Sequence, residues 1–205
     1  MTRRGVGWIG VLVQTVLAVW ADGGEVHHWG ATNPVNETPP WTLGWNGGTV
    51  APGTDTINQV EYPYWEINTP GGQSRWYEYQ GISDDFTNNW GIRAIVRLPT
   101  LSSSLFNAYV AVAEGTKFIA VGLRSDGLFW CKNPNANTQE SLLDFAPDSN
   151  KYYKIVLVRD RNRDVVHVLL DDVKVKELPF AGFQNYIYFT NMVHFGDSTG
   201  YGGAS

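Results

Sequence analysis

Apolar and polar residues alternate along much of this chain, which is typical of strands that bury one face. In residues 90–98, Ile92 and Val96 fall on one side of an extended backbone and Arg93 and Arg97 on the other. Turn sequences rich in Gly, Asp and Asn separate such segments. Further strands are expected over residues 106–113, 117–124, 128–131, 152–159, 165–170, 173–178, 186–189 and 192–195.

The remaining segments lack this regularity. Residues 22–63 are rich in Gly, Pro, Asn and Thr and predict an irregular lead-in with one or two short strands, while residues 132–149 predict a loop. No segment shows an apolar period of 3.6 residues, so α-helix should be minor. So many short strands in one domain require two packed antiparallel sheets, because a single open sheet would leave an apolar face in water.

The first 21 residues form a separate unit. Arg3 and Arg4 precede an apolar run over residues 6–20, and Ala21 ends a small-residue cleavage pattern before Asp22. This arrangement predicts a secretory signal peptide, and its apolar run is shorter than the ~20 residues that span a bilayer. We therefore expect a signal peptide over residues 1–21, one β-sandwich domain over residues 22–205, and a secreted, extracellular or periplasmic location.

The charge balance of the chain excludes some classes of binding partner. The chain has 205 residues, with 20 acidic residues against 15 basic ones and a formal net charge of −5. Such an acidic balance argues against nucleic acid or an anionic membrane surface as a partner. Cys131 is the single cysteine, so an intramolecular disulfide is excluded, and its apolar neighbours indicate a buried small side chain.

Three segments together carry a resemblance to a known family. They are KYYKIVLVRDRNRDVVHVLLDDVKVKEL (151–178), MVHFGDSTGYGGAS (192–205), and WEINT (65–69) followed by WYEY (76–79). Their order of strands and turns resembles the laminin-G-like, concanavalin A-like jelly roll of lectin-like modules in secreted proteins. The resemblance implies an all-β, two-sheet antiparallel jelly-roll sandwich.

The chain departs from that pattern in two places. The turn at Asp171-Asp172 is commonly Asp-Gly in such domains, but Asp also tolerates left-handed geometry. In addition, the family pattern places a last strand after the Phe-Gly-Asp stretch, and here the chain stops at Ser205. Either the domain lacks that strand or an earlier segment fills its place.

The stretch YWEINTPGGQSRWYEYQ (64–80) is nearly symmetric about Gly72 and predicts a hairpin. In that hairpin Trp65 would oppose Tyr79 and Ile67 would oppose Tyr77, with all four directed at the core. Because side chains alternate, the other face would carry the candidate ligand-binding set. That set is Tyr64, Glu66, Asn68, Trp76, Glu78 and Gln80.

Glu66 and Glu78 allow three interpretations. A retaining glycosidase places two carboxyl groups ~5 to 5.5 Å apart across the scissile bond. A lectin face uses aromatic rings for the apolar side of a sugar and carboxylates or amides for its hydroxyls. The third interpretation is a solvent-facing strand pair that happens to carry these residues, held by Arg75, Arg93 or Arg97, or by a cation.

Catalytic motifs are weak in this sequence. The Glu-x-Asp-x-x-Glu spacing of jelly-roll glucanases and the arginine-rich, Gln-x-His set of alginate-lyase-like members do not occur. The histidines are scattered, and His167 and His194 lie within strand patterns, where structural histidines are common. We therefore assign no catalytic residue, and binding is favoured over catalysis.

Acidic and amide groups could hold calcium, which needs six to eight oxygen ligands. The candidates are Asp84-Asp85 with Asn88-Asn89, Asp171-Asp172, and Asp197, and turn formation explains each of them equally well. The sequence therefore predicts no cofactor and leaves a metal open.

The expected function is a secreted, non-catalytic module that binds a glycan or another extracellular surface ligand, without nucleic acid or stable membrane insertion. One alternative is a polysaccharide hydrolase or lyase that uses Glu66 and Glu78. The other is a structural or protein-interaction domain of a larger surface protein. The fold alone does not choose among them.

Overall fold

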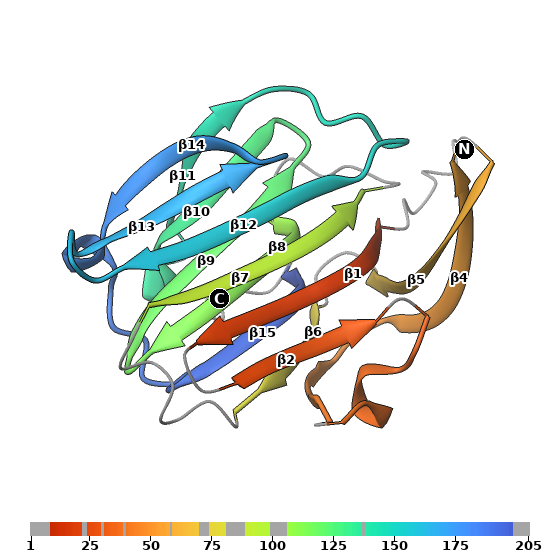
Figure 1. The fold of residues 1–205 in the computed structure, drawn as a ribbon, viewed down its shortest axis with the longest axis horizontal. Helices are drawn as coiled ribbons and strands as arrows, with labels where there is room; N and C mark the ends of the chain where they lie inside the picture. The colour runs from red at the N-terminus through yellow and green to blue at the C-terminus, as the bar shows by residue number, and fades with distance from the viewer. Residues whose placement is uncertain are drawn as a thin grey trace, which may run out of the picture.

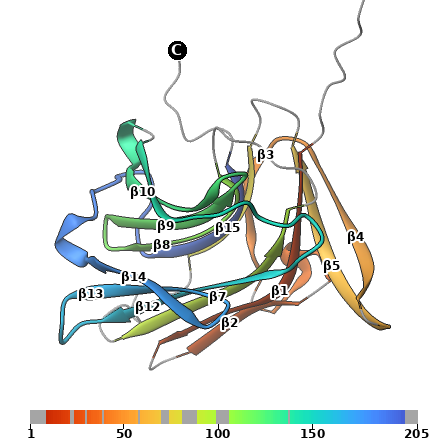
Figure 2. The ribbon, with the colours of Figure 1, turned by 90° about the horizontal axis from the view of Figure 1, so that it is seen from above.

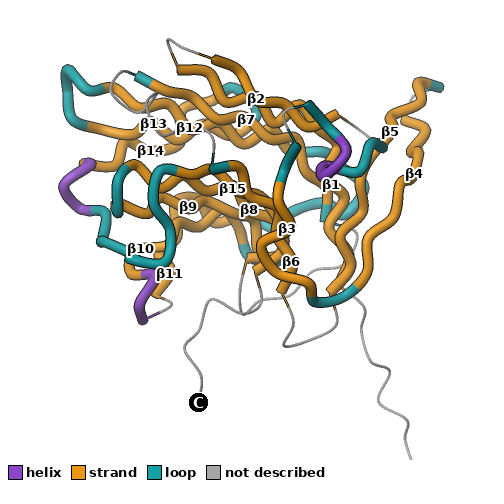
Figure 3. The backbone as a smooth tube through the Cα atoms, turned by 90° about the horizontal axis from the view of Figure 1, so that it is seen from below, coloured by secondary structure: helices purple, strands orange, loops and turns teal. Residues whose placement is uncertain are grey.

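The computed structural model describes residues 9–21, 24–29, 31–38, 40–57, 59–69, 74–80, 89–98, 106–136 and 138–198. Within these residues the regular structure is almost entirely β-strand, interrupted by short 3-10 turns such as Pro34–Asn36, Pro134–Ala136 and Phe180–Gly182 (Figure 3). The predicted all-β class is confirmed. In the same residues no helix has the length and apolar character needed to cross a membrane.

The described strands form two antiparallel sheets that pack face to face (Figures 1 and 2). Sheet A has the order β14-β13-β12-β7-β1-β5-β4, with β2 also paired to β1. These strands are β1 (Ile9–Ala21), β2 (Gly24–Trp29), β4 (Thr49–Ile57), β5 (Val60–Thr69), β7 (Trp90–Arg97), β12 (Tyr153–Asp160), β13 (Val165–Leu170) and β14 (Val173–Pro179).

Sheet B has the order β11-β10-β9-β8-β15-β6-β3. Its strands are β3 (Thr42–Asn46), β6 (Ser74–Tyr79), β8 (Phe106–Glu114), β9 (Lys117–Arg124), β10 (Gly127–Asn133), β11 (Thr138–Asp144) and β15 (Met192–Ser198). At one end of the sandwich β5 and β4 turn steeply away from the rest of sheet A (Figure 2). The two-sheet antiparallel sandwich predicted from the sequence is therefore present.

Apolar alternation builds the core between the sheets. In β12 the side chains of Tyr153, Ile155 and Leu157 are buried, as the sequence predicts. They meet the inward-facing residues of sheet B, such as Val110 and Val121, in one cluster. The Asp171–Asp172 turn between β13 and β14 has φ values of 51° and 66°, so the expected left-handed geometry at these aspartates is also confirmed.

Strands β8, β9 and β10 bury side chains on both faces. A second apolar cluster lies on the outer face of sheet B, away from the main core. It includes Tyr109, Ala111, Phe118 and Phe129, and Phe189 from the segment that follows β14 packs against it. Burial on two faces explains why these strands show longer apolar runs than β7 or β12.

Several predicted boundaries are wrong. Residues 22–63 hold β2, β3, β4 and the start of β5 rather than one or two strands, and residues 132–149 contain β11. Residues 186–189 form a turn rather than a strand, because this segment crosses over the face of sheet B instead of extending it.

The N-terminal segment has a definite place in the fold. Residues 9–21, predicted as the apolar part of a signal peptide, form β1, which pairs with β7 on one edge and with β5 and β2 on the other. Strand β1 therefore occupies an internal position in sheet A. Cleavage of a signal peptide stays a prediction, and it would remove an internal strand of sheet A.

Candidate functional site

The predicted hairpin over residues 64–80 is not formed. Strand β5 lies in sheet A between β1 and β4, whereas β6 lies in sheet B between β15 and β3. The chain therefore crosses from one sheet to the other between Thr69 and Ser74. Alternation predicted the faces of these strands correctly, but their pairing is set by contacts with strands distant in sequence.

The predicted core-facing set is confirmed. Trp65, Ile67 and Tyr77 are buried, and Tyr79 packs against the same cluster. The indole N–H of Trp65 donates a hydrogen bond of 3.1 Å to the Tyr77 hydroxyl. These four residues meet across the interior of the sandwich rather than across a hairpin.

The predicted ligand-binding set is consequently divided between two surfaces. Tyr64, Glu66 and Asn68 alternate with buried residues of β5 and face outward from sheet A, whereas Trp76 and Glu78 face outward from sheet B. Stacked sheets lie ~10 Å apart, and outward side chains are farther from one another still. Glu66 and Glu78 therefore cannot flank one glycosidic bond, and the catalytic pair considered from the sequence is excluded by the fold.

On sheet A, Tyr64 forms an aromatic platform. Its register partner on the edge strand β4 is Gly53, and a side chain at position 53 would collide with the ring and hydroxyl of Tyr64. The ring therefore lies across the glycine, while Tyr64 stays half-exposed. Such an arrangement leaves one ring face directed outward, which is the contact that the apolar side of a sugar ring uses.

Next to Tyr64, a cluster of polar side chains is held together by hydrogen bonds and an ion pair. Asp55 of β4 receives a hydrogen bond from the Tyr152 hydroxyl and an ion pair of 2.8 Å from Arg97 of β7. The Arg97 guanidinium lies 5.5 Å from the centre of the Tyr152 ring, and Tyr62 and Tyr152 have ring centres 6.4 Å apart. Strands β4, β5 and β7 and the residue before β12 thus contribute to one surface, here called the tyrosine face: Asp55, Tyr62, Tyr64, Glu66, Arg97 and Tyr152.

Two phenols of the tyrosine face, Tyr64 and Tyr152, have raised pKa values. Burial, followed by the negative charge of Asp55, raises the pKa of Tyr64 above its ordinary value. Burial and the hydrogen bond to Asp55 raise the pKa of Tyr152 in the same direction. A neutral phenol donates one hydrogen bond, so the Tyr64 hydroxyl is suited to a sugar oxygen, whereas the Tyr152 hydroxyl already donates to Asp55. Neither phenol is suited to general-base or nucleophilic chemistry at neutral pH.

On sheet B, Trp76 forms a second platform of related construction. A side chain at Gly44, in the edge strand β3, would collide with the Trp76 indole and with the Glu78 carboxylate. The indole N–H donates to Glu78 at 3.1 Å, and the Gln80 amide donates to the other Glu78 oxygen at 2.9 Å. Both Glu78 oxygens are therefore engaged within the protein, which suits a positioning role rather than acid catalysis.

The remaining candidate groups are structural. His194 is fully buried beside Tyr109, and burial lowers its pKa to about 3, so it stays neutral. Burial raises the pKa of the Cys131 thiol to about 12, which leaves it unreactive and fits the predicted small buried side chain. His167 lies on the surface within 3.3 Å of Glu177 and 3.8 Å of Asp160.

The calcium candidates gain no support. Asp171 and Asp172 form ion pairs with Lys151 and Lys154, and residues 84–88 lie outside the described part of the chain. Asp197, expected to cap a turn, instead lies buried in β15 and accepts a hydrogen bond from Thr69. Within the described ranges, no group of three or more His, Cys, Asp or Glu side chains is placed to hold a metal ion.

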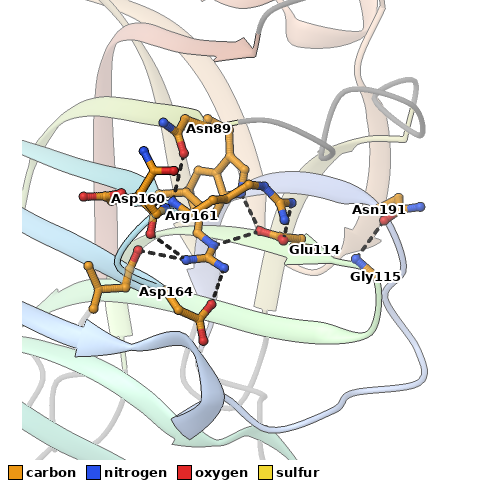
Figure 4. Close-up of polar contacts among 11 residues, drawn as sticks. Asn89, Glu114, Gly115, Asp160, Arg161, Asp164 and Asn191 are labelled. Carbon is orange, nitrogen blue, oxygen red and sulfur yellow. Dashed lines mark hydrogen bonds and ion pairs between the residues drawn. The ribbon is translucent and has the colours of Figure 1, made fainter.

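An ion-pair network around Glu114 is not predicted from the sequence. Glu114, at the end of β8 in sheet B, accepts from the Trp90 indole at 2.7 Å and pairs with both Arg159 and Arg161 (Figure 4). The Arg159 side chain is only 3% exposed and also binds Asp164. A signal for it was present, because Arg159 falls on the core-facing side of β12 with Ile155 and Leu157, where a charge requires a buried partner. The network joins the two sheets and is structural.

Comparison with known proteins supports the fold. No protein-family model matches the sequence, and no curated protein matches it. The fold is similar to a solved structure of the conserved carbohydrate esterase vb_24B_21 from the Shiga toxin-encoding bacteriophage phi24B. The two share a TM-score of 0.57 and 12% sequence identity, over 94% of this chain and 93% of that chain. At this identity the likeness establishes a shared β-sandwich fold.

Proposed function

We propose that this protein is a non-catalytic carbohydrate-binding domain that uses the tyrosine face of sheet A. The main observation in support of the proposal is that the Tyr64 ring lies across Gly53. Beside it lies Tyr152, whose neutral hydroxyl donates a hydrogen bond to Asp55. A sugar ring would stack on Tyr64, and Glu66 would accept hydrogen bonds from its hydroxyls. Because Arg97 and Asp55 already hold each other at 2.8 Å, little side-chain ordering is needed when the ligand binds.

The structural neighbour lends independent support for the ligand class. That neighbour is a carbohydrate esterase, and its fold spans 94% of this chain. The resemblance to laminin-G-like and concanavalin A-like lectin modules agrees with the same class. Catalysis by Glu66 and Glu78 is not part of the proposal, because these residues lie on the outer faces of different sheets.

We extend the proposal to an exported protein that meets glycans outside the cytoplasm, on the basis of the signal-peptide pattern in residues 1–21. Intact-mass measurement of the protein recovered from the culture medium or periplasm tests this. Loss of residues 1–21 would show cleavage, retention of the whole chain outside the cytoplasm would show export with β1 in place, and recovery from the cytoplasm alone would overturn the location.

Affinity gel electrophoresis against soluble polysaccharides tests the binding site. The panel should contain xylan and glucomannan as neutral chains and polygalacturonate and alginate as acidic ones. Replacing Tyr64 by Ala should weaken retardation by about tenfold, while Tyr64→Phe keeps the ring and should bind almost normally. Equal retardation of the wild type and the Tyr64→Ala protein would exclude the site.

The same panel separates binding from the alternatives. Reducing ends or unsaturated products released by the wild-type protein would indicate a hydrolase or lyase. Failure to bind any polysaccharide on the panel, from a folded protein, would favour a structural or protein-interaction domain. Binding without turnover is the expected result.

A further inference from the structure

The tyrosine face carries an excess of negative charge. Its charged side chains are Asp55, Glu66 and Arg97, so two carboxylates face one guanidinium. The Arg97 charge is already balanced, because one of its terminal nitrogens lies 2.8 Å and 3.1 Å from the two carboxylate oxygens of Asp55. Glu66 is half-exposed and forms no ion pair within the described part of the chain. Its negative charge is therefore left without a balancing cation.

This excess charge acts on the Tyr64 hydroxyl. Burial is the largest cause of the raised pKa of Tyr64, and the negative charges of Asp55 and then Glu66 follow it. Arg97 acts in the opposite direction with a smaller effect. The carboxylates thus outweigh the guanidinium at the polar end of the aromatic platform. A cationic group of a ligand is attracted to such a position, and an anionic group is repelled from it.

The lysines next to Tyr152 in the sequence do not cancel this charge. Lys151 pairs with Asp171 at 2.6 Å, and Lys154 pairs with Asp172. Both aspartates belong to the turn between β13 and β14, which lie at the opposite edge of sheet A from β4 and β5. These pairs hold the two ammonium groups on the side of Tyr152 that is away from Tyr64.

The aromatic rings of this surface suit a cation as well as a sugar. A ring attracts a cation that lies within ~6 Å of its centre, and the Arg97 guanidinium already lies 5.5 Å from the centre of the Tyr152 ring. Among the described residues no cation is placed over the Tyr64 ring. Glu66 follows Tyr64 by two positions on β5, so both side chains project from the same face. One ammonium group can therefore contact the ring and the carboxylate together.

We infer that the tyrosine face binds glycans that carry protonated amino groups, such as chains of glucosamine, with an amine held between the Tyr64 ring and the Glu66 carboxylate. The inference rests on the proposed function and narrows its ligand class. The amine supplies the cation that Glu66 lacks and makes a charge-assisted hydrogen bond to it. A uronate or sulfate group would be repelled by the same carboxylate. An N-acetylated chain would keep the stacking contact with Tyr64 but lose the charge contact.

Isothermal titration with glycol chitosan and with its N-acetylated form tests the inference, because the two soluble polymers differ in whether the amine carries a charge. The wild type should bind the free-amine form about tenfold more tightly. This preference should fall as salt is added and as the pH is raised until the sugar amines are neutral. Glu66→Gln keeps an oxygen acceptor but loses the charge, so most of the preference should disappear.

Glu61→Gln is the matched control, since it removes the same charge from an exposed position on the opposite face of β5. It should keep the preference of the wild type. An equal loss in Glu61→Gln and Glu66→Gln would indicate general attraction of a polycation to an acidic protein and would overturn the inference. Equal affinity of the wild type for the two polymers would also overturn it.

The Tyr64→Ala protein separates this inference from the proposed function. If Tyr64→Ala weakens binding to both polymers while Glu66→Gln keeps the full preference for the free amine, the tyrosine face stands and the amino-sugar inference fails. If Tyr64→Ala binds both polymers like the wild type, the proposed function fails, and the inference fails with it.

Discussion

The Trp65 indole donates to the Tyr77 hydroxyl at 3.1 Å, and this buried bond joins β5 of sheet A to β6 of sheet B. The two residues lie in neighbouring strands of the sequence but in different sheets. Their bond thus marks the point where the chain passes from one layer of the sandwich to the other.

Removing this bond should destabilise the fold. Tyr77→Phe keeps the ring but leaves the Trp65 N–H buried without its partner, which costs about 1 to 3 kcal/mol of unfolding free energy. Urea denaturation followed by tryptophan fluorescence measures the change. Tyr79→Phe, in the same strand but half-buried, is the control and should have a smaller effect.

Gly53 should be as important for binding as Tyr64 itself. A methyl group in Gly53→Ala would occupy the position of the Tyr64 ring and tilt it off the sheet. Polysaccharide affinity should fall about tenfold with little change in melting temperature. Gly182→Ala, where no atom lies within 4 Å of the added group, is the matched control and should bind like the wild type.

Two buried groups should act in opposite directions on the pH dependence of stability. Burial raises the pKa of Asp197 to about 7, so its folded form holds a proton that the unfolded chain releases, and its contribution is lost as pH rises towards 7. Burial lowers the pKa of His194 to about 3, so its contribution is present above pH 6.5 and is lost as pH falls towards 3. In the wild type these slopes partly cancel.

Single variants should separate the two slopes. Asp197→Asn leaves His194 alone, so acidification from pH 7 to pH 4 should destabilise it more steeply than the wild type. His194→Gln leaves Asp197 and should show the reverse trend. Thermal denaturation at several pH values measures both, and parallel profiles for all three proteins would refute the assignment.

The Glu114 network should be a major contact between the sheets. Glu114→Gln leaves Arg159, which is 3% exposed, without one of its two carboxylate partners. Breaking a buried ion pair costs about 3 to 5 kcal/mol, so a large drop in the denaturation midpoint is expected. Glu177→Gln removes the surface partner of Arg163 and Lys174 and should change stability far less.

The N-terminal strand gives a prediction about the chain itself. A variant that begins at Asp22 lacks β1, which pairs with both β5 and β7. Because both neighbours would lose ladder hydrogen bonds inside the sheet, this variant should unfold at lower denaturant concentration or aggregate. A truncated protein as stable as the full chain would show that residues 1–21 are dispensable, as a cleaved signal peptide requires.

Much of the fold could be predicted because side-chain alternation has a period of two and depends only on local sequence. The sequence predicts strands over residues 90–98, 117–124 and 165–170, and the structure has β7, β9 and β13 there. Strand β11 is not predicted because this edge strand buries none of its residues fully, so its sequence carries no clear apolar alternation. Residues 186–189 have the aromatic content of a strand, but in the structure they pack across a face of sheet B.

The sequence by itself determined that this protein is an all-β sandwich. It also determined which residues of the 64–80 stretch face the core. Only the tertiary structure decided that Tyr64 and Glu66 lie on one surface while Trp76 and Glu78 lie on another. The physical reason is that alternation specifies the face of a strand but not its partner. Partners are chosen by hydrogen bonding and burial among strands far apart in sequence, such as β6 with β15 and β5 with β1.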